Sequence, residues 1–210
     1  NRCRGCAMSL RSVLFRRRLS GLPGRLSTIG LLAGVLATAM LALPAQAALK
    51  VGAAAPDFSA EAAVGGKAFG FRLSESLAKG PVVLYFYPKA FTSGCTVEAH
   101  AFAEATPQFQ SLGATVVGLS NDDIETLKKF SVEACRNRFA VAADPQARVI
   151  RAYDAGFALL PSTADRISYV IDPQGRVMAV HASMDPQSHV TETLKAVERW
   201  KAAQTKKSPG

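Results

Sequence analysis

The feature that most restricts what this chain can fold into is a buried strand followed directly by a long amphipathic helix. Residues 82–87 (VVLYFY) form a continuous β-branched and aromatic run, typical of a strand buried on both faces of a parallel or mixed sheet. Beyond Pro88, apolar residues recur every three or four positions, which predicts a helix that ends at Gly113. Residues 114–119 (ATVVGL) predict a second buried strand. The core of the chain is therefore expected to be an α/β sheet.

The rest of the chain extends this pattern. Ser120-Asn121-Asp122 offers caps to a second helix, and a short helical piece is expected after Pro145. Residues 168–172 and 176–182 are joined by a Pro-Gln-Gly turn, which predicts an antiparallel hairpin. A last helix is expected from about residue 187 to about residue 203. This order predicts a three-layer α/β/α domain with a mixed central sheet, the layout of a thioredoxin-like domain.

Residues 1–47 have the three parts of a secretory signal peptide. Arg16-Arg17-Arg18 and Arg25 precede an apolar run of about fifteen residues, and small residues follow up to Ala47. The alternative is an uncleaved membrane anchor. The apolar run argues against it, because it is shorter than the ~20 residues of a membrane-spanning helix. We expect export to the bacterial periplasm or the medium, cleavage after Ala47 and no stable membrane association afterwards. The domain would occupy residues 48–205, with a frayed basic tail at 206–210.

The positive charge belongs mostly to this leader. The chain has a net charge of +9, and the leader holds seven arginines and no acidic residue, which leaves about +2 on the remainder. With nearly equal numbers of basic and acidic residues, the domain does not have the basic surface expected of a nucleic-acid-binding protein. We therefore expect no nucleic-acid partner.

Cys95 is the candidate nucleophile. The strand-to-helix junction places it in the first helical turn, where unpaired backbone N–H groups and the helix dipole favour a thiolate. Thr92 can turn its hydroxyl back over the same turn, and Pro88 restricts the backbone through which the sulfur is approached. The alternative is that Cys95 is a small buried core residue, as many free cysteines are.

The spacing P-x-x-x-T-x-x-C, formed by Pro88, Thr92 and Cys95, resembles the active-site signature of the peroxiredoxins, thiol peroxidases with a thioredoxin-like domain. Two longer stretches are similar to the bacterioferritin-comigratory, or Q-type, branch of that family. They are YFYPK followed by GCTVE at residues 85–98, and RISYVID at residues 166–172. The resemblance covers the chain from about residue 51 to the last helix.

This resemblance implies a mechanism. Cys95 would attack the O–O bond of hydrogen peroxide or an organic hydroperoxide and become a sulfenic acid. Arg166 would stabilise the thiolate and hold the peroxide by charge-assisted hydrogen bonds. Thr92 would orient the sulfur and the peroxide, and Glu98 would pair with Arg166 and aim it. Without the resemblance, Glu98 and Arg166 would be interpreted as a surface ion pair.

A sulfenic acid needs a second thiol, and in many relatives this lies five residues after the first cysteine. Here that position is His100, so the remaining candidate is Cys135 in the second helix, which resembles an alternative placement in the branch. Pairing between two helices would need local unwinding, because a disulfide requires Cα atoms within about 7 Å. Otherwise Cys135 is an unpaired helix cysteine in a one-cysteine enzyme.

The resemblance also implies a monomer that takes electrons from a dithiol donor. No haem, flavin or metal is expected, and His100, His181 and His189 lack the spacing of metal ligands. A disulfide reductase would need C-x-x-C at the helix start, but Thr92 stands three residues before Cys95. The other alternative is a non-catalytic thioredoxin-like redox or chaperone module in which Cys95 and Cys135 form a permanent disulfide.

Overall fold

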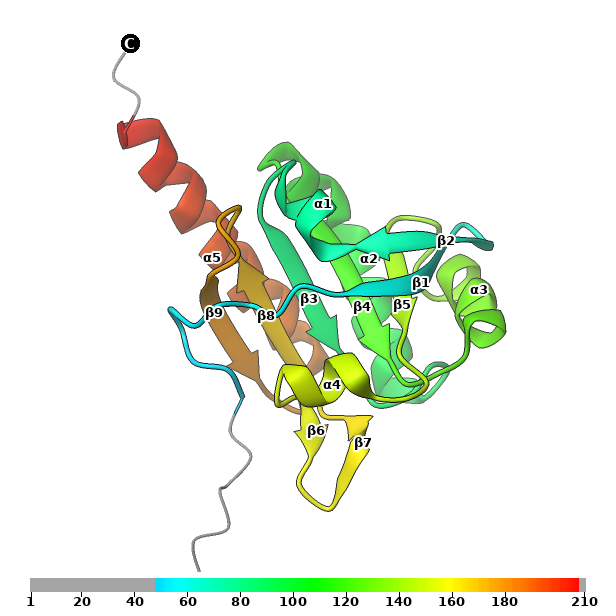
Figure 1. The fold of residues 1–210 in the computed structure, drawn as a ribbon. Helices are drawn as coiled ribbons and strands as arrows, with labels where there is room; N and C mark the ends of the chain where they lie inside the picture. The colour runs from blue at the N-terminus through cyan, green and yellow to red at the C-terminus, as the bar shows by residue number, and fades with distance from the viewer. Residues whose placement is uncertain (1–47, 208–210) are drawn as a thin grey trace, which may run out of the picture. The chain divides into compact units, whose positions relative to one another are not determined.

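The computed structural model describes residues 48–207 (Figure 1). The expected signal peptide therefore lies outside the described residues, as do residues 208–210 of the expected tail. In the described part of the chain, no helix is both long enough and apolar enough to cross a bilayer.

Strands and helices alternate along most of this domain. The strands are β1 (Ser59–Val64), β2 (Lys67–Arg72), β3 (Val82–Phe86), β4 (Thr115–Ser120), β5 (Ala140–Ala143), β6 (Gly156–Phe157), β7 (Leu160–Ala164), β8 (Ile167–Ile171) and β9 (Val177–Ala182). The helices are α1 (Leu73–Leu77), α2 (Ser93–Ser111), α3 (Ile124–Glu133), α4 (Arg148–Ala152) and α5 (Pro186–Lys207).

The central sheet is mixed, as predicted. Within residues 48–207 it has seven strands in the order β2-β1-β5-β4-β3-β8-β9. Strands β3, β4 and β5 are parallel, whereas β8 pairs antiparallel with both β3 and β9, and β1 pairs antiparallel with both β2 and β5. Helices α2 and α5 lie behind the sheet in Figure 1, and α1 and α4 lie in front of it. This is the predicted three-layer α/β/α arrangement.

The central strand β3 is buried on both faces, which explains its unbroken apolar sequence. Alternate side chains enter two cores because successive side chains of a strand point to opposite faces. One core contains residues of α2, α3 and α5, and the other contains residues of α1 and α4. Along β3 and the residue after it, the side chains of the first core are Val83, Tyr85 and Tyr87. Those of the second core are Val82, Leu84 and Phe86.

Several elements differ from the sequence prediction. Helix α3 is capped by Asp123, whose carboxylate accepts from Thr126 N, and not by residues 120–122. Helix α3 ends at Glu133, so Cys135 lies in the following turn rather than in the helix. Helix α5 continues through Lys207, two residues into the expected frayed tail. Strand β5 and the β6–β7 ribbon were not predicted, because their segments are short and β5 is rich in alanine.

Candidate active site

Cys95 lies where the sequence prediction placed it, in the first turn of α2. Thr92 occupies the N-cap position with an extended backbone, and the helix begins at Ser93. The Cys95 side chain is only 2% exposed. Backbone N–H groups of the first turn have no partner inside the helix, so the positive end of the helix dipole lies beside the sulfur.

Pro88 and Thr92 frame the loop between β3 and α2. Pro88 comes two residues after the last residue of β3, and Tyr87 N still donates to Leu119 O of the neighbouring strand, so the loop leaves the sheet at Pro88. The Thr92 hydroxyl is exposed and donates to Lys89 O at 3.0 Å. The resemblance implied that Thr92 orients the sulfur, but in the structure its hydroxyl donates to the loop backbone and not to Cys95 Sγ.

Asp122 holds this loop from the neighbouring strand end, a role that the sequence reasoning missed. Its buried carboxylate accepts from Ala90 N at 2.7 Å, from Lys89 Nζ at 3.1 Å and from Ser120 Oγ at 2.9 Å. The parallel pairing of β3 with β4 brings the two strand ends to one edge of the sheet, which explains these contacts. The available signal was an acidic residue that closely follows a predicted strand.

Arg166 reaches Cys95 from the start of β8. Its Nη2 donates to Cys95 Sγ at 3.6 Å, and its Nη1 donates to Glu98 Oε2. Arg166 is 5% exposed and Glu98 is fully buried, so this is not the surface ion pair of the alternative interpretation. The structure thus brings together Cys95, Arg166 and Glu98, as the resemblance implied.

Glu98 is an unusual carboxylate because it is buried under the arginine. Burial raises the pKa of Glu98 to about 8, although the charge and hydrogen bond of Arg166 oppose this rise. Its Oε1 has no hydrogen-bond partner among residues 48–207. Glu98 therefore anchors Arg166 through Oε2 and keeps Oε1 buried without a partner in this part of the chain.

Gly94 leaves room for the guanidinium. A Cβ built on Gly94 would lie 3.0 Å from Arg166 Nη2, closer than such contacts normally are. A side chain at this position would therefore require the guanidinium of Arg166 to shift away from the first helical turn. Gly94 precedes the candidate nucleophile in the sequence, but its role becomes visible only once the position of Arg166 is known.

Cys135 belongs to the same apolar core as Cys95, and it is fully buried. Both are free thiols, so the permanent disulfide of the alternative interpretation is absent from the structure. Burial raises the pKa of the Cys135 thiol well above its usual value. Cys135 is therefore an unreactive thiol in this conformation.

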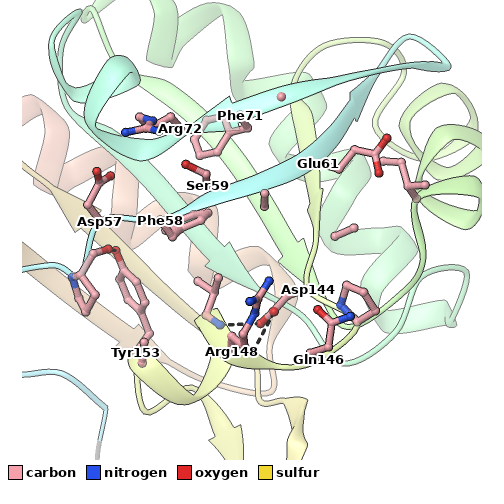
Figure 2. A pocket seen from close by; sticks show the side chains of 18 of the residues that line it. Asp57, Phe58, Ser59, Glu61, Phe71, Arg72, Asp144, Gln146, Arg148 and Tyr153 are labelled. Carbon is pink, nitrogen blue, oxygen red and sulfur yellow. Dashed lines mark hydrogen bonds between the residues drawn. The ribbon is translucent and has the colours of Figure 1, made fainter.

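The described residues contain no group of three or more His, Cys, Asp or Glu side chains arranged to hold a metal ion. A surface hollow of about 980 Å³ lies between β1, β2 and α4 (Figure 2). Its lining includes none of the six predicted site residues. The Asp144 carboxylate in this hollow accepts hydrogen bonds from the backbone N–H groups of Arg148 and Val149 at the start of α4 (Figure 2). Asp144 therefore has a structural role.

Comparison with known proteins identifies the family. Residues 51–180 match the model of the AhpC/TSA family. The chain belongs to the AhpC/TSA family. Peroxiredoxin Q of Oryza sativa subsp. japonica, described as chloroplastic, is 33% identical over 188 residues, which cover 82% of this chain and 84% of the rice protein. Peroxiredoxin Q of Populus jackii, also chloroplastic, is 36% identical over 131 residues, which are 61% of this chain and 61% of the poplar protein.

A solved structure supports the same assignment. The crystal structure of peroxidoxin BcpB from Mycobacterium tuberculosis is 31% identical, with a TM-score of 0.66, and the match covers 72% of this chain and 97% of that one. The resemblance to the Q-type branch and the thioredoxin-like fold are thereby confirmed.

Proposed function

We propose that this AhpC/TSA family member is a thiol peroxidase that reduces hydrogen peroxide and organic hydroperoxides through Cys95. The observation that supports this most directly is the position of Arg166, which donates to Cys95 Sγ from a buried position. A guanidinium here stabilises the thiolate, and its remaining N–H groups can donate to a peroxide oxygen.

The first step transfers one oxygen atom. The Cys95 thiolate attacks the nearer peroxide oxygen, the O–O bond breaks, and its electron pair leaves with the second oxygen as hydroxide or alkoxide. That oxygen takes a proton and departs as water or an alcohol, while Cys95 becomes a sulfenic acid. Arg166 stabilises the charge that builds on the leaving oxygen.

The second step regenerates the thiol. The thiolate of Cys135 attacks the sulfenic sulfur, water leaves, and a Cys95–Cys135 disulfide forms. An external dithiol of the thioredoxin type then reduces this disulfide and is itself oxidised. Because Cys135 is buried and lies in a turn, its attack requires that turn to open.

One experiment tests both steps. The reduced protein, Cys95→Ser and Cys135→Ser are each mixed with a slight excess of hydrogen peroxide, quenched over milliseconds to seconds and analysed by mass spectrometry. We expect a Cys95–Cys135 disulfide in the wild type and a sulfenic or over-oxidised Cys95 in Cys135→Ser. A wild type that stops at sulfenic acid would make this a one-cysteine peroxidase. Oxidation of Cys95 no faster than that of a free thiol in solution would overturn the peroxidase function.

We also propose that the protein is exported to the periplasm or the medium and acts there as a monomer. The basic and apolar order of residues 1–47 supports export. Cleavage after Ala47 would keep the first described contact of the domain, in which Leu49 N donates to the Tyr169 hydroxyl at 3.2 Å. N-terminal sequencing of the protein from fractionated cells tests the cleavage, and sedimentation of the purified protein tests the monomer. A cytoplasmic protein with an intact leader, or a stable dimer, would contradict the respective proposal.

A further inference from the structure

The turn that carries Cys135 is connected to the loop before Cys95 by one aromatic side chain. Phe130 of α3 is fully buried, and its carbonyl oxygen accepts from Ala134 N at 2.9 Å and from Cys135 N at 3.0 Å. These two hydrogen bonds hold the start of the segment that joins α3 to β5, residues 134–139, which we call the Cys135 turn. Phe130 therefore helps to hold the Cys135 turn closed.

Two aromatic rings of the other cysteine segment pack against the Phe130 ring. Tyr87, the residue after β3, stacks on it with ring centroids 5.5 Å apart, and Phe91 meets it edge to face at 5.2 Å. Both rings belong to the Cys95 loop, residues 87–92, which leads into α2. Aromatic pairs of this geometry stabilise packing beyond the area that they bury. Tyr87 is buried but Phe91 is 45% exposed, so Phe91 can leave Phe130 without opening the core.

Phe91 is held in an unfavourable backbone conformation. Its φ of 65° lies in the left-handed region, which bulky L residues rarely adopt. Hydrogen bonds on both sides fix this conformation. Ala90 N donates to Asp122 Oδ2 at 2.7 Å, and the Thr92 hydroxyl donates to Lys89 O at 3.0 Å. Such strain persists only where the surrounding contacts impose it, so opening of the Cys95 loop would release it.

The Cys135 turn is strained in the same way. Residues 48–207 contain five non-glycine residues with positive φ, and two of them, Arg136 at 52° and Asn137 at 59°, directly follow Cys135. With Phe91, three of the five therefore lie in the two segments that carry or precede a cysteine. Release of backbone strain favours opening of both segments, and the contact between Phe91 and Phe130 opposes it.

We propose that Phe91 is a positioning residue for the resolving step: while the Cys95 loop is closed, its ring packs on Phe130 and keeps the Cys135 turn shut, and opening of the loop frees both segments together. This inference rests on the peroxidase function proposed above. It explains how a thiol as deeply buried as Cys135 becomes available after Cys95 has been oxidised.

The order of events follows from the space around the sulfur. Cys95 is 2% exposed, so the oxygen atom added on oxidation requires the surrounding loop to shift. The ring of Phe91 then leaves Phe130, and the Cys135 turn opens. The Cys135 thiolate attacks the sulfenic sulfur, the S–S bond forms, and the S–O bond breaks. The hydroxide that leaves is protonated to water, and both electrons of the new bond come from Cys135.

The first test needs no peroxide. In the Cys95→Ser protein, the rate at which N-ethylmaleimide alkylates Cys135, measured by mass spectrometry of the Cys135 peptide, reports opening of the turn. We expect Phe91→Ala to raise this rate about fivefold, the effect of losing one aromatic pair. Val97→Ala is the matched control, because Val97 lies two residues after position 95 and is 46% exposed, and it should leave the rate unchanged. An unchanged rate in Phe91→Ala would overturn the proposal.

A second variant separates the ring from the backbone strain. Glycine adopts a left-handed φ without strain, so Phe91→Gly removes the ring while it favours the observed loop conformation. In the Cys95→Ser protein, Phe91→Gly should also speed the alkylation of Cys135. Alkylation at the parent rate would mean that strain, and not the ring, controls the turn, and would overturn the proposal.

A double variant tests whether the two rings act through one contact. In the Cys95→Ser protein, Phe91→Ala combined with Phe130→Leu should be alkylated no faster than Phe130→Leu alone, because the second substitution has already removed the contact. If the two effects multiplied, Phe91 would act on Cys135 by another route, and the proposal would be overturned.

Kinetics with hydrogen peroxide distinguish this role from a general loss of structure. In Phe91→Ala with both cysteines present, the ratio of the rate constant of disulfide formation to that of sulfenic acid formation should rise about fivefold, as measured by quenched mass spectrometry. An unchanged ratio would indicate a structural role alone and overturn the proposal. A wild type whose Cys95 reacts no faster than a free thiol would overturn the peroxidase function instead, and the alkylation rates distinguish the two failures because they need no peroxide.

Discussion

Arg166 Nη2 lies 3.6 Å from Cys95 Sγ, although 71 residues separate them in the chain. The pairing of β8 with β3 explains this contact, because Ile167 is opposite Phe86, the last residue of β3. The antiparallel register therefore delivers Arg166 to the strand end from which the cysteine loop leaves. The site depends on this register as much as on the residues themselves.

Gly94→Ala should separate activity from stability. The new methyl group would lie 3.0 Å from Arg166 Nη2 and push the guanidinium away from the sulfur, so we expect Cys95 oxidation to slow by about tenfold or more. Alanine is favoured over glycine in a helix by about 0.5–1 kcal/mol, so the free energy of unfolding should not fall. Stopped-flow kinetics and urea unfolding measure the two quantities.

The matched control for this substitution is Gly70→Ala. A Cβ at Gly70 has open space within 4 Å, so Cys95 should be oxidised at the wild-type rate. Wild-type kinetics in Gly94→Ala would show that Arg166 can move without cost and is not constrained by this glycine.

Asp122→Asn should weaken the loop before α2. The substitution removes the charge that accepts from Ala90 N and Lys89 Nζ inside the protein, and we expect a loss of about 1–3 kcal/mol in unfolding free energy, together with slower Cys95 oxidation. Urea unfolding and peroxide kinetics check this. The neighbouring Asp123→Asn is the control, because asparagine caps a helix as well as aspartate does. Equal behaviour of the two variants would contradict the role of Asp122.

Local sequence patterns were sufficient to predict the centre of the fold. The buried strand, the helix beginning near Cys95 and the hairpin that carries Arg166 all follow from periodicity and turn residues within single segments. Strand β5 was missed because AVAA has a single β-branched residue and no alternation, and it is a strand only because β4 and β1 pair with it.

The site was predictable in its residues but not in all its contacts. The motif identified Cys95, Arg166 and Glu98. It could not reveal that Thr92 turns its hydroxyl to Lys89, since a hydroxyl selects its partner from the local loop geometry. His189 lies on the last helix and meets Glu98 only through tertiary packing of α5 against α2 and β8, so no local pattern could indicate it.

Stability should respond to pH through Glu98. Its pKa is raised from 4.5 to about 8 by burial, so the folded state binds the proton more tightly than the unfolded state. The stabilisation is complete below about pH 4.5 and is lost as the pH rises through about 8. Glu98→Gln removes this dependence, so its unfolding free energy relative to wild type should increase from pH 5 to pH 9. If the difference in unfolding free energy between Glu98→Gln and the wild type were the same at every pH in this range, the raised pKa of Glu98 would be contradicted.

His189 should act in the opposite direction. Burial lowers its pKa from 6.5 to about 4, so the neutral ring stabilises the folded state above pH 6.5, and this contribution is lost as the pH falls through about 4. His189→Asn cannot be protonated, so it should lose less stability than wild type between pH 7 and pH 4. Thermal or urea unfolding at matched pH values measures the difference. If the unfolding free energies of wild type and His189→Asn changed equally with pH, the lowered pKa of His189 would be contradicted.

The disulfide step should depend on opening of the turn that holds Cys135. Burial raises the pKa of its thiol, and Cys135 N donates to Phe130 O at 3.0 Å at the end of α3. Urea below the unfolding transition, or Phe130→Leu, should therefore speed disulfide formation several-fold by exposing the thiol. Each step is followed by quenched mass spectrometry, and oxidation of Cys95 to sulfenic acid should be unaffected by low urea.

Val132→Ala is the control for Phe130→Leu, because Val132 lies on the exposed side of the same helix at 43% exposure. It should leave disulfide formation unchanged, since it removes no core contact that holds the turn closed. If neither urea nor Phe130→Leu changed the rate of disulfide formation, the two sulfurs would meet without unfolding of the turn. Resolution would then be limited by chemistry at Cys95 and not by access to Cys135.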